Sequence, residues 1–150
     1  MNDDRPANGT GSVKSLWPVV ALFAAMMLIY LLFHLRCILF SKTAARETSA
    51  LMAVAELLKA EEDCHARHGR YAGLVGLDEM GLIDAGLLAS RNTHYCIEVR
   101  AQRESYEIVA TPKRYGRMSA TRSFYADKSG RTHEADKGGV EANAADEPID

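Results

Sequence analysis

The chain is organised around residues 16–69, which read LWPVVALFAAMMLIYLLFHLRCILF and then SKTAARETSALMAVAELLKAEEDCHARHG. The first part is apolar on every side, and the second part alternates apolar and polar residues with a helical period. Pro18 falls where the first helical turn would lie, and a proline there loses no hydrogen bond. We therefore expect one long helix that ends near Gly69, a residue type suited to a helix C-cap.

The apolar part of this helix has the length of a membrane span. Residues 16–35 contain no charged side chain and are interrupted only by His34. At about 1.5 Å per residue they extend about 30 Å, which is the thickness of a bilayer core. A cleavable signal peptide would have a shorter apolar region and a small-residue cleavage site. Residues 33–40 show neither feature, so the sequence predicts a retained transmembrane helix at residues 15–40, with the lipid bilayer as its partner.

The remaining composition limits the class of protein. The 150-residue chain has a net charge of −2, a balance that gives no reason to expect nucleic acid as a partner. About 90 residues are left for a folded domain, enough for one modest core. No nucleophile–base pair or phosphate-binding loop stands out, and we interpret the acidic run at residues 61–63 as a solvated helix face. The sequence thus predicts a protein that is not an enzyme and has no cofactor.

Periodicity predicts the domain organisation. Residues 1–14 and the acidic residues 134–150 are expected to be disordered tails, and residues 41–133 a globular domain. Within the domain, residues 94–102, 105–111 and 121–126 are predicted strands joined by short links, which favours an antiparallel meander. The fold class is α+β, with the helix packed on a sheet of three to four strands. The helix face expected to meet the sheet comprises Ala50, Leu51, Ala53, Val54, Leu57, Leu58, Ala60 and Cys64.

Five short elements follow this helix in a distinctive order. They are RETSA at residues 46–50, GRYA at 69–72, GLID at 81–84, YEIVATP at 106–112 and TRSFYADKSG at 121–130. Together they resemble the type IV pilin and pseudopilin superfamily, over the chain from the membrane helix to about Thr132. The resemblance implies a pilin-like fold and a structural or assembly role in a type IV pilus or type II secretion-like system. It also implies other pilin-like or secretion-system subunits as partners.

The chain departs from that family at its processing site. Pilins carry a Gly-Phe-Thr-Leu-Ile-Glu-like site for prepilin peptidase, with an acidic residue early in the apolar run. The corresponding residues 14–19 read KSLWPV, without that glycine, phenylalanine or acid. We therefore expect that prepilin peptidase does not process this protein. The alternative function is a single-pass, membrane-tethered binding or sensor module, with metal as one candidate ligand.

Two cysteines and two histidines leave three interpretations open. Cys64 and Cys96 are candidates for one disulfide if the domain lies in an oxidising compartment. However, Cys96 shares strand parity with polar residues and would point away from the helix unless a bulge turned it. Cys64 and His68, one helical turn apart, and His94 and Cys96, on one strand face, are candidate zinc ligands. The third interpretation is two unrelated thiols.

Orientation rests on two conflicting signals. The flank after the span carries Arg36, Lys42 and Arg46 against Arg5 and Lys14 before it, which slightly favours a cytoplasmic C-terminal domain. The pilin-like order implies the opposite. We expect a bacterial inner-membrane protein with a cytoplasmic N-terminus and a periplasmic or extracytoplasmic C-terminal domain.

Overall fold

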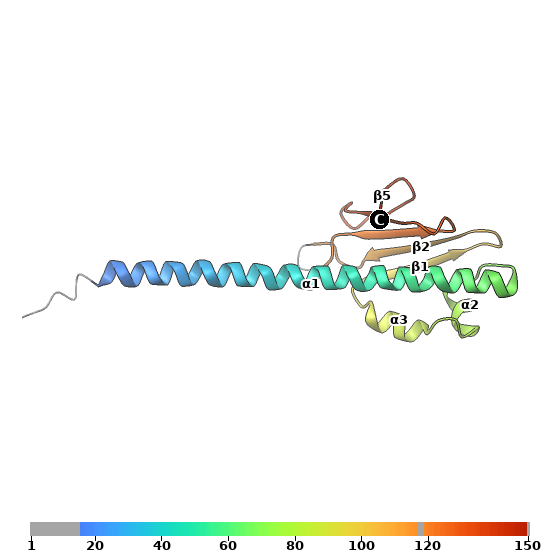
Figure 1. Cartoon of the computed structure of the whole chain (residues 1–150), viewed down its shortest axis with the longest axis horizontal. Coiled ribbons are helices and arrows are strands. Elements are labelled where there is room, and N and C mark those ends of the chain that lie inside the picture. Colours follow the sequence, from blue (N-terminus) through green and yellow to red (C-terminus); the bar gives the residue numbers. More distant parts are fainter. Residues whose placement is uncertain (1–15, 117–118, 150) are drawn as a thin grey trace, which may run out of the picture. The chain divides into compact units, whose positions relative to one another are not determined.

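The computed structural model describes residues 16–116 and 119–149 (Figure 1). The predicted tail at residues 1–14 lies outside the described residues. The chain divides into two units, residues 1–37 and residues 38–150. Helix α1, Trp17–His68, contributes to both units. It ends where predicted, because Gly69 takes a φ of +66° and donates its amide to the carbonyl of His65 at 2.8 Å.

In the first unit, α1 is an apolar helix. Its large side chains are mostly exposed, including Trp17 at 77% and Phe33 at 71%. Burying such a surface is strongly favourable, and a lipid bilayer is the surrounding that accepts apolar side chains on all sides. α1 is long and apolar enough to cross a membrane, which is consistent with a single-pass membrane protein.

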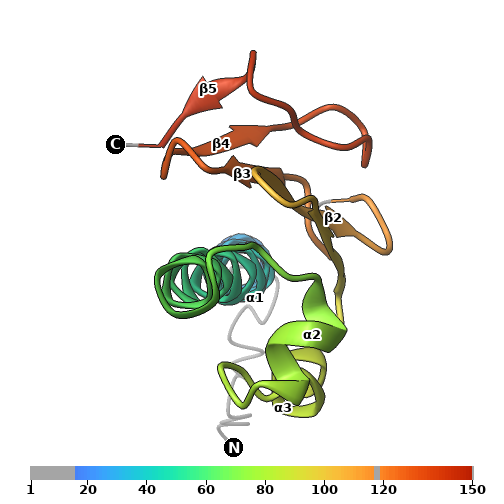
Figure 2. The same ribbon diagram turned by 90° about the vertical axis from the view of Figure 1, so that its right-hand side faces the viewer.

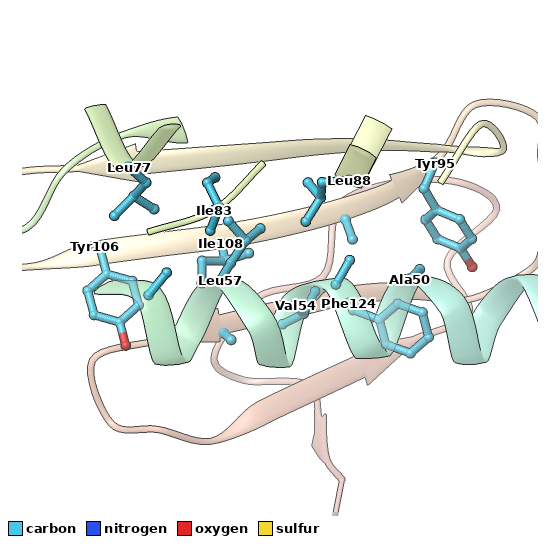
Figure 3. Close-up of a cluster of buried hydrophobic side chains, with 14 of the residues drawn as sticks. Ala50, Val54, Leu57, Leu77, Ile83, Leu88, Tyr95, Tyr106, Ile108 and Phe124 are labelled. Atoms are coloured by element: carbon cyan, nitrogen blue, oxygen red, sulfur yellow. The ribbon is translucent and has the colours of Figure 1, made fainter. Parts of the chain in front are cut away.

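In the second unit, one face of α1 packs against the other side chains of the hydrophobic core (Figure 3). Ala50, Val54 and Leu57 are each 0% exposed and pack with Ile108 and Phe124 of the sheet. Their spacing of three and four residues places them on one side of the helix. The predicted helix–sheet core, and with it the α+β class, is therefore confirmed.

The sheet is an antiparallel meander of five strands in sequence order, β1 to β5. The strands are β1 (Tyr95–Ala101), β2 (Tyr106–Pro112), β3 (Ser123–Asp127), β4 (Thr132–Ala135) and β5 (Glu147–Pro148). The first three match the predicted strands within two residues. The predicted number of three to four strands was too small.

The missed strands lie in the segment predicted to be a disordered tail. β4 pairs with β3, β5 pairs with β4, and Ala142 in the loop between them is 3% exposed. Ser123 also donates its hydroxyl to the carbonyl of Val140 at 2.7 Å. The prediction was wrong because main-chain pairing to the open edge of β3 orders this segment, and such pairing leaves no apolar period in the sequence.

Two short helices, α2 (Leu74–Glu79) and α3 (Ala85–Arg91), lie beside α1 on a different side from β3 to β5 (Figure 2). Asp84 caps α3 by accepting the amide of Leu87 at 2.7 Å. Leu77, Ile83 and Leu88 enter the core from this segment. The glycine-rich stretch at residues 69–90 thus closes the core over a second side of α1.

Candidate functional site

The structure does not bring the four predicted cysteine and histidine ligands together. Cys64 is fully buried and contacts the sulfur of Met80 at 4.0 Å, whereas His68, His94 and Cys96 are exposed. Among residues 16–116 and 119–149, no three His, Cys, Asp or Glu side chains are grouped as metal ligands. The proposed zinc site therefore has no support in this fold.

The structure does not pair the candidate disulfide cysteines Cys64 and Cys96, and the geometry gives the reason. All three cysteines are free. Tyr95, the neighbour of Cys96, lies toward the same end of the core as Ala50 (Figure 3). Along α1, residue 64 is about 21 Å from residue 50, far beyond the Cα separation that a disulfide spans. The strand-parity argument was correct, because Cys96 is exposed while Tyr95 is buried.

Glu61 was predicted to lie on the solvated face of the helix, and the structure buries it. We interpreted residues 61–63 as a solvated face, but Glu61 is 0% exposed and lies on the core face of α1. The helical period itself would have located it, because Leu57 and Cys64 lie four residues before and three after it. The interpretation failed because it followed the charge of the residue and not its position in the repeat.

Glu61 joins α1 to the segment that follows it. One carboxylate oxygen accepts the amide of Ala72 at 2.9 Å, and the other, Oε1, has no hydrogen-bond partner within the described chain. Tyr71 lies next to that amide, between the ring of His65 at 4.6 Å and the ring of Tyr106 at 4.7 Å. The Glu61 carboxyl and the His65 ring thus attach residues 69–73 to the end of α1, and the Tyr106 ring packs this segment against β2.

Burial sets the electrostatics of this cluster. Desolvation raises the pKa of the Glu61 carboxyl, the Ala72 amide lowers it, and the charge of Glu62 raises it further. Desolvation also raises the pKa of the Cys64 thiol, with Glu61 adding to the effect. Burial thus disfavours the charged form of both groups relative to the unfolded chain. A buried, protonated thiol is a poor nucleophile, so we interpret this cluster as structural.

We expect Glu61→Gln to remove one source of pH-dependent stability. The folded-state pKa of Glu61 is raised above the unfolded value, so the folded chain binds the proton more tightly. The contribution of Glu61 is therefore fully present below the unfolded pKa and is lost as pH rises through the folded-state pKa. Glutamine keeps an acceptor for the Ala72 amide but binds no proton in this range.

The measurement is urea unfolding of the full-length protein in detergent micelles between pH 4 and pH 9. Stability of the Glu61→Gln variant should fall less with rising pH than stability of the parent. Glu56→Gln, at an exposed position of the same helix, is the matched control and should preserve the parent's slope. Equal slopes for parent and Glu61→Gln would contradict the assignment.

Two surface hollows lie elsewhere on the domain. One, of about 430 Å³, lies on the outer face of the sheet and is lined by Arg100, Glu107, Tyr125 and the loop at residues 141–145. The charge of Arg100 is already matched there, since its guanidinium contacts Glu98 at 2.8 Å and Glu141 at 2.7 Å. Sequence reasoning missed this hollow because it treated the loop as part of a disordered tail.

The second hollow is basic and has a volume of about 270 Å³. It is lined by Thr93, His94, Lys113, Arg114 and Ser119. The amide of Lys113 donates to the carbonyl of His94 at 2.9 Å, which holds the β2 exit against the β1 entry. The predicted metal ligand His94 thus lies among cations, an environment that does not favour a metal ion.

Comparison of this chain with protein family models, with curated proteins and with solved structures finds no match in any of the three.

Proposed function

We propose that this protein is a membrane-anchored, pilin-like structural or assembly component of a type IV pilus or type II secretion-like system. The observation that carries the proposal is the construction of α1. Its N-terminal part is an exposed apolar helix of membrane-spanning length, and its C-terminal part is the core helix of a small α+β domain. The same helix therefore supplies both a membrane anchor and the core of a folded domain.

The pilin-like sequence elements support the proposal by their positions in the domain. Glu47, within the RETSA element, accepts the Thr121 amide at 3.0 Å and the Thr121 hydroxyl at 3.1 Å. Tyr71, within GRYA, packs on Tyr106, the first residue of YEIVATP. These elements are far apart in sequence and meet across the core, so each has a structural use in this fold.

We predict that the mature protein keeps its N-terminus. The reason is the missing glycine and phenylalanine at residues 14–19, which lie at and before the start of the described chain. Intact-mass spectrometry of protein extracted from membranes, and of material sheared from the cell surface, is the test. The expected result is the full-length mass in the membrane fraction alone. A shortened chain beginning near Ser15 would show processing, and its recovery in sheared filaments would make the protein a filament subunit.

We also predict a cytoplasmic N-terminus and a C-terminal domain outside the cytoplasm, in the bacterial inner membrane. The reason is the pilin-like order of elements, since the charge difference between the flanks is small. Two reporters fused after Asp150, one active only outside the cytoplasm and one active only inside, distinguish the orientations. Activity of the cytoplasmic reporter alone would reverse this topology.

The second candidate function, a membrane-tethered binding module, is favoured by the hollow on the outer face of the sheet. It is large enough for a small polar ligand. Arg100, its principal cation, is already paired with two glutamates, and a ligand would have to displace one of them. We therefore rank this function below the structural one.

A further inference from the structure

The ends of the C-terminal domain differ in charge. β1 begins, and β2 ends, at the end of the domain from which α1 continues toward the apolar segment. At that end Arg46 donates to the carbonyl of Ser119 at 3.1 Å, and Thr121 donates to Glu47. Residues 119–121, which precede β3, therefore contact α1 at Arg46 and Glu47.

This end carries exposed positive charge. Lys113 and Arg114 follow β2, are exposed, and enter no ion pair with any residue in the described ranges. His94 and Lys113 line the same hollow, and Lys42 is exposed on α1. We call the set Lys42, His94, Lys113 and Arg114 the basic rim. Exposed cations without acidic partners in the protein indicate a surface that binds an anionic partner.

Chain connectivity keeps part of this end of the domain close to the end of the apolar segment. Along α1, residue 46 is about 12 Å from residue 38, where the second unit begins. Headgroup layers extend several ångströms beyond the hydrocarbon core, and the screening length at physiological salt is about 8 Å. Lysine and arginine side chains extend further toward that layer from the backbone. The length of α1 alone therefore keeps residue 46 near the headgroup layer if the apolar helix spans the bilayer.

We propose that the basic rim binds the anionic phospholipid headgroups around the protein's own membrane helix and holds the domain against the bilayer surface. This inference rests on the membrane anchoring in the proposed function. It adds anionic phospholipids to that function as the ligand of the rim. Each basic residue near an anionic membrane surface strengthens the attraction about five-fold. A free phosphate ion shares the chemistry of a lipid headgroup. We favour the headgroup because the lipids that surround a membrane helix carry their headgroups where that helix leaves the bilayer.

Acetylation of native lysines by a water-soluble reagent tests the proposal on the full-length protein in lipid nanodiscs. Lys113 should react about five-fold more slowly in discs containing about 30% phosphatidylglycerol than in pure phosphatidylcholine discs. Lys128 is the internal control, because it follows β3 at the opposite end of the sheet and is exposed. Its rate should be equal in the two lipids, and about 0.5 M NaCl should abolish the difference at Lys113.

Two single charge reversals give the matched comparison. Arg114→Glu should restore most of the Lys113 reactivity in anionic discs. Arg103→Glu should leave Lys113 slow, because Arg103 lies in the hairpin after β1, about 20 Å along the strand from the start of β1. Arg114→Lys keeps the charge and should behave as the parent. Equal rates in both lipids, or equal effects of Arg114→Glu and Arg103→Glu, would overturn the proposal.

Two further arms separate the alternatives. If about 10 mM inorganic phosphate slows Lys113 equally in pure phosphatidylcholine discs, the hollow is a small-anion site and the lipid assignment is wrong. Co-elution of the protein with discs of both compositions reports the anchor independently of the rim. Failure to incorporate into any disc would contradict the proposed membrane function, whereas incorporation without slowed acetylation would contradict only the rim's role.

Discussion

Leu57→Asp should unfold the C-terminal domain and leave the membrane anchor in place. Leu57 is 0% exposed and lies at the centre of the core face of α1, among Val54, Ile108 and Leu77 (Figure 3). Burying an unpaired carboxylate there, together with losing the leucine contacts, destabilises by more than about 4 kcal/mol. That is a large part of the stability of a small domain, which is about 5–15 kcal/mol.

Limited proteolysis of the full-length protein in detergent micelles measures this effect. The parent should yield a resistant fragment that contains the sheet, and the Leu57→Asp variant should yield none. Met52→Asp is the matched control, because Met52 is on the same helix but is 69% exposed. Unchanged resistance of the Leu57→Asp variant would mean that the sheet does not cover this face of α1.

Met26→Asp combined with Ile29→Asp should remove the protein from the membrane. Both side chains lie in the middle of the apolar segment, at 63% and 67% exposure. An aspartate at the centre of a span costs about 2.5–3.5 kcal/mol, so the pair costs about 5–7 kcal/mol, enough to prevent stable insertion. The second unit has its own core, so its fold should be unaffected.

Alkaline extraction of cell membranes is the measurement for this pair. The parent and the conservative control, Met26→Leu with Ile29→Val, should remain in the pellet. The double-aspartate variant should appear in the supernatant or be degraded. A variant that still pellets as the parent does would show that this segment is not the anchor.

The membrane segment and the core helix could be read from sequence because both depend on local pattern. An uninterrupted apolar run and a repeat of three and four residues describe how one helix meets its surroundings, whatever lies further along the chain. The first three strands were predictable for the same reason, since alternation and turn residues mark each strand. The positive φ of Gly69 followed from its place just after the last helical residue.

The two acidic segments were misread because composition was weighed above position. Glu61 was assigned to solvent, yet its place in the repeat buries it beneath residues 69–73. Residues 134–150 were assigned to a disordered tail, yet β4 and β5 complete the sheet. The helical repeat marked Glu61 as a core position, whereas the main-chain pairing of β4 and β5 leaves no such side-chain pattern in the sequence.

The sequence by itself determined a helix long and apolar enough to span a membrane, the core face of α1 and the α+β class, since each arises from the side-chain pattern within one segment. Only the tertiary structure decided where the functional side chains lie relative to one another. It left Cys64 and Cys96 unpaired, buried the Glu61 carboxyl, and gathered His94, Lys113 and Arg114 around one hollow. The physical reason is that strand register and the packing of β1 against α1 set these distances, and both depend on contacts between segments far apart in the chain.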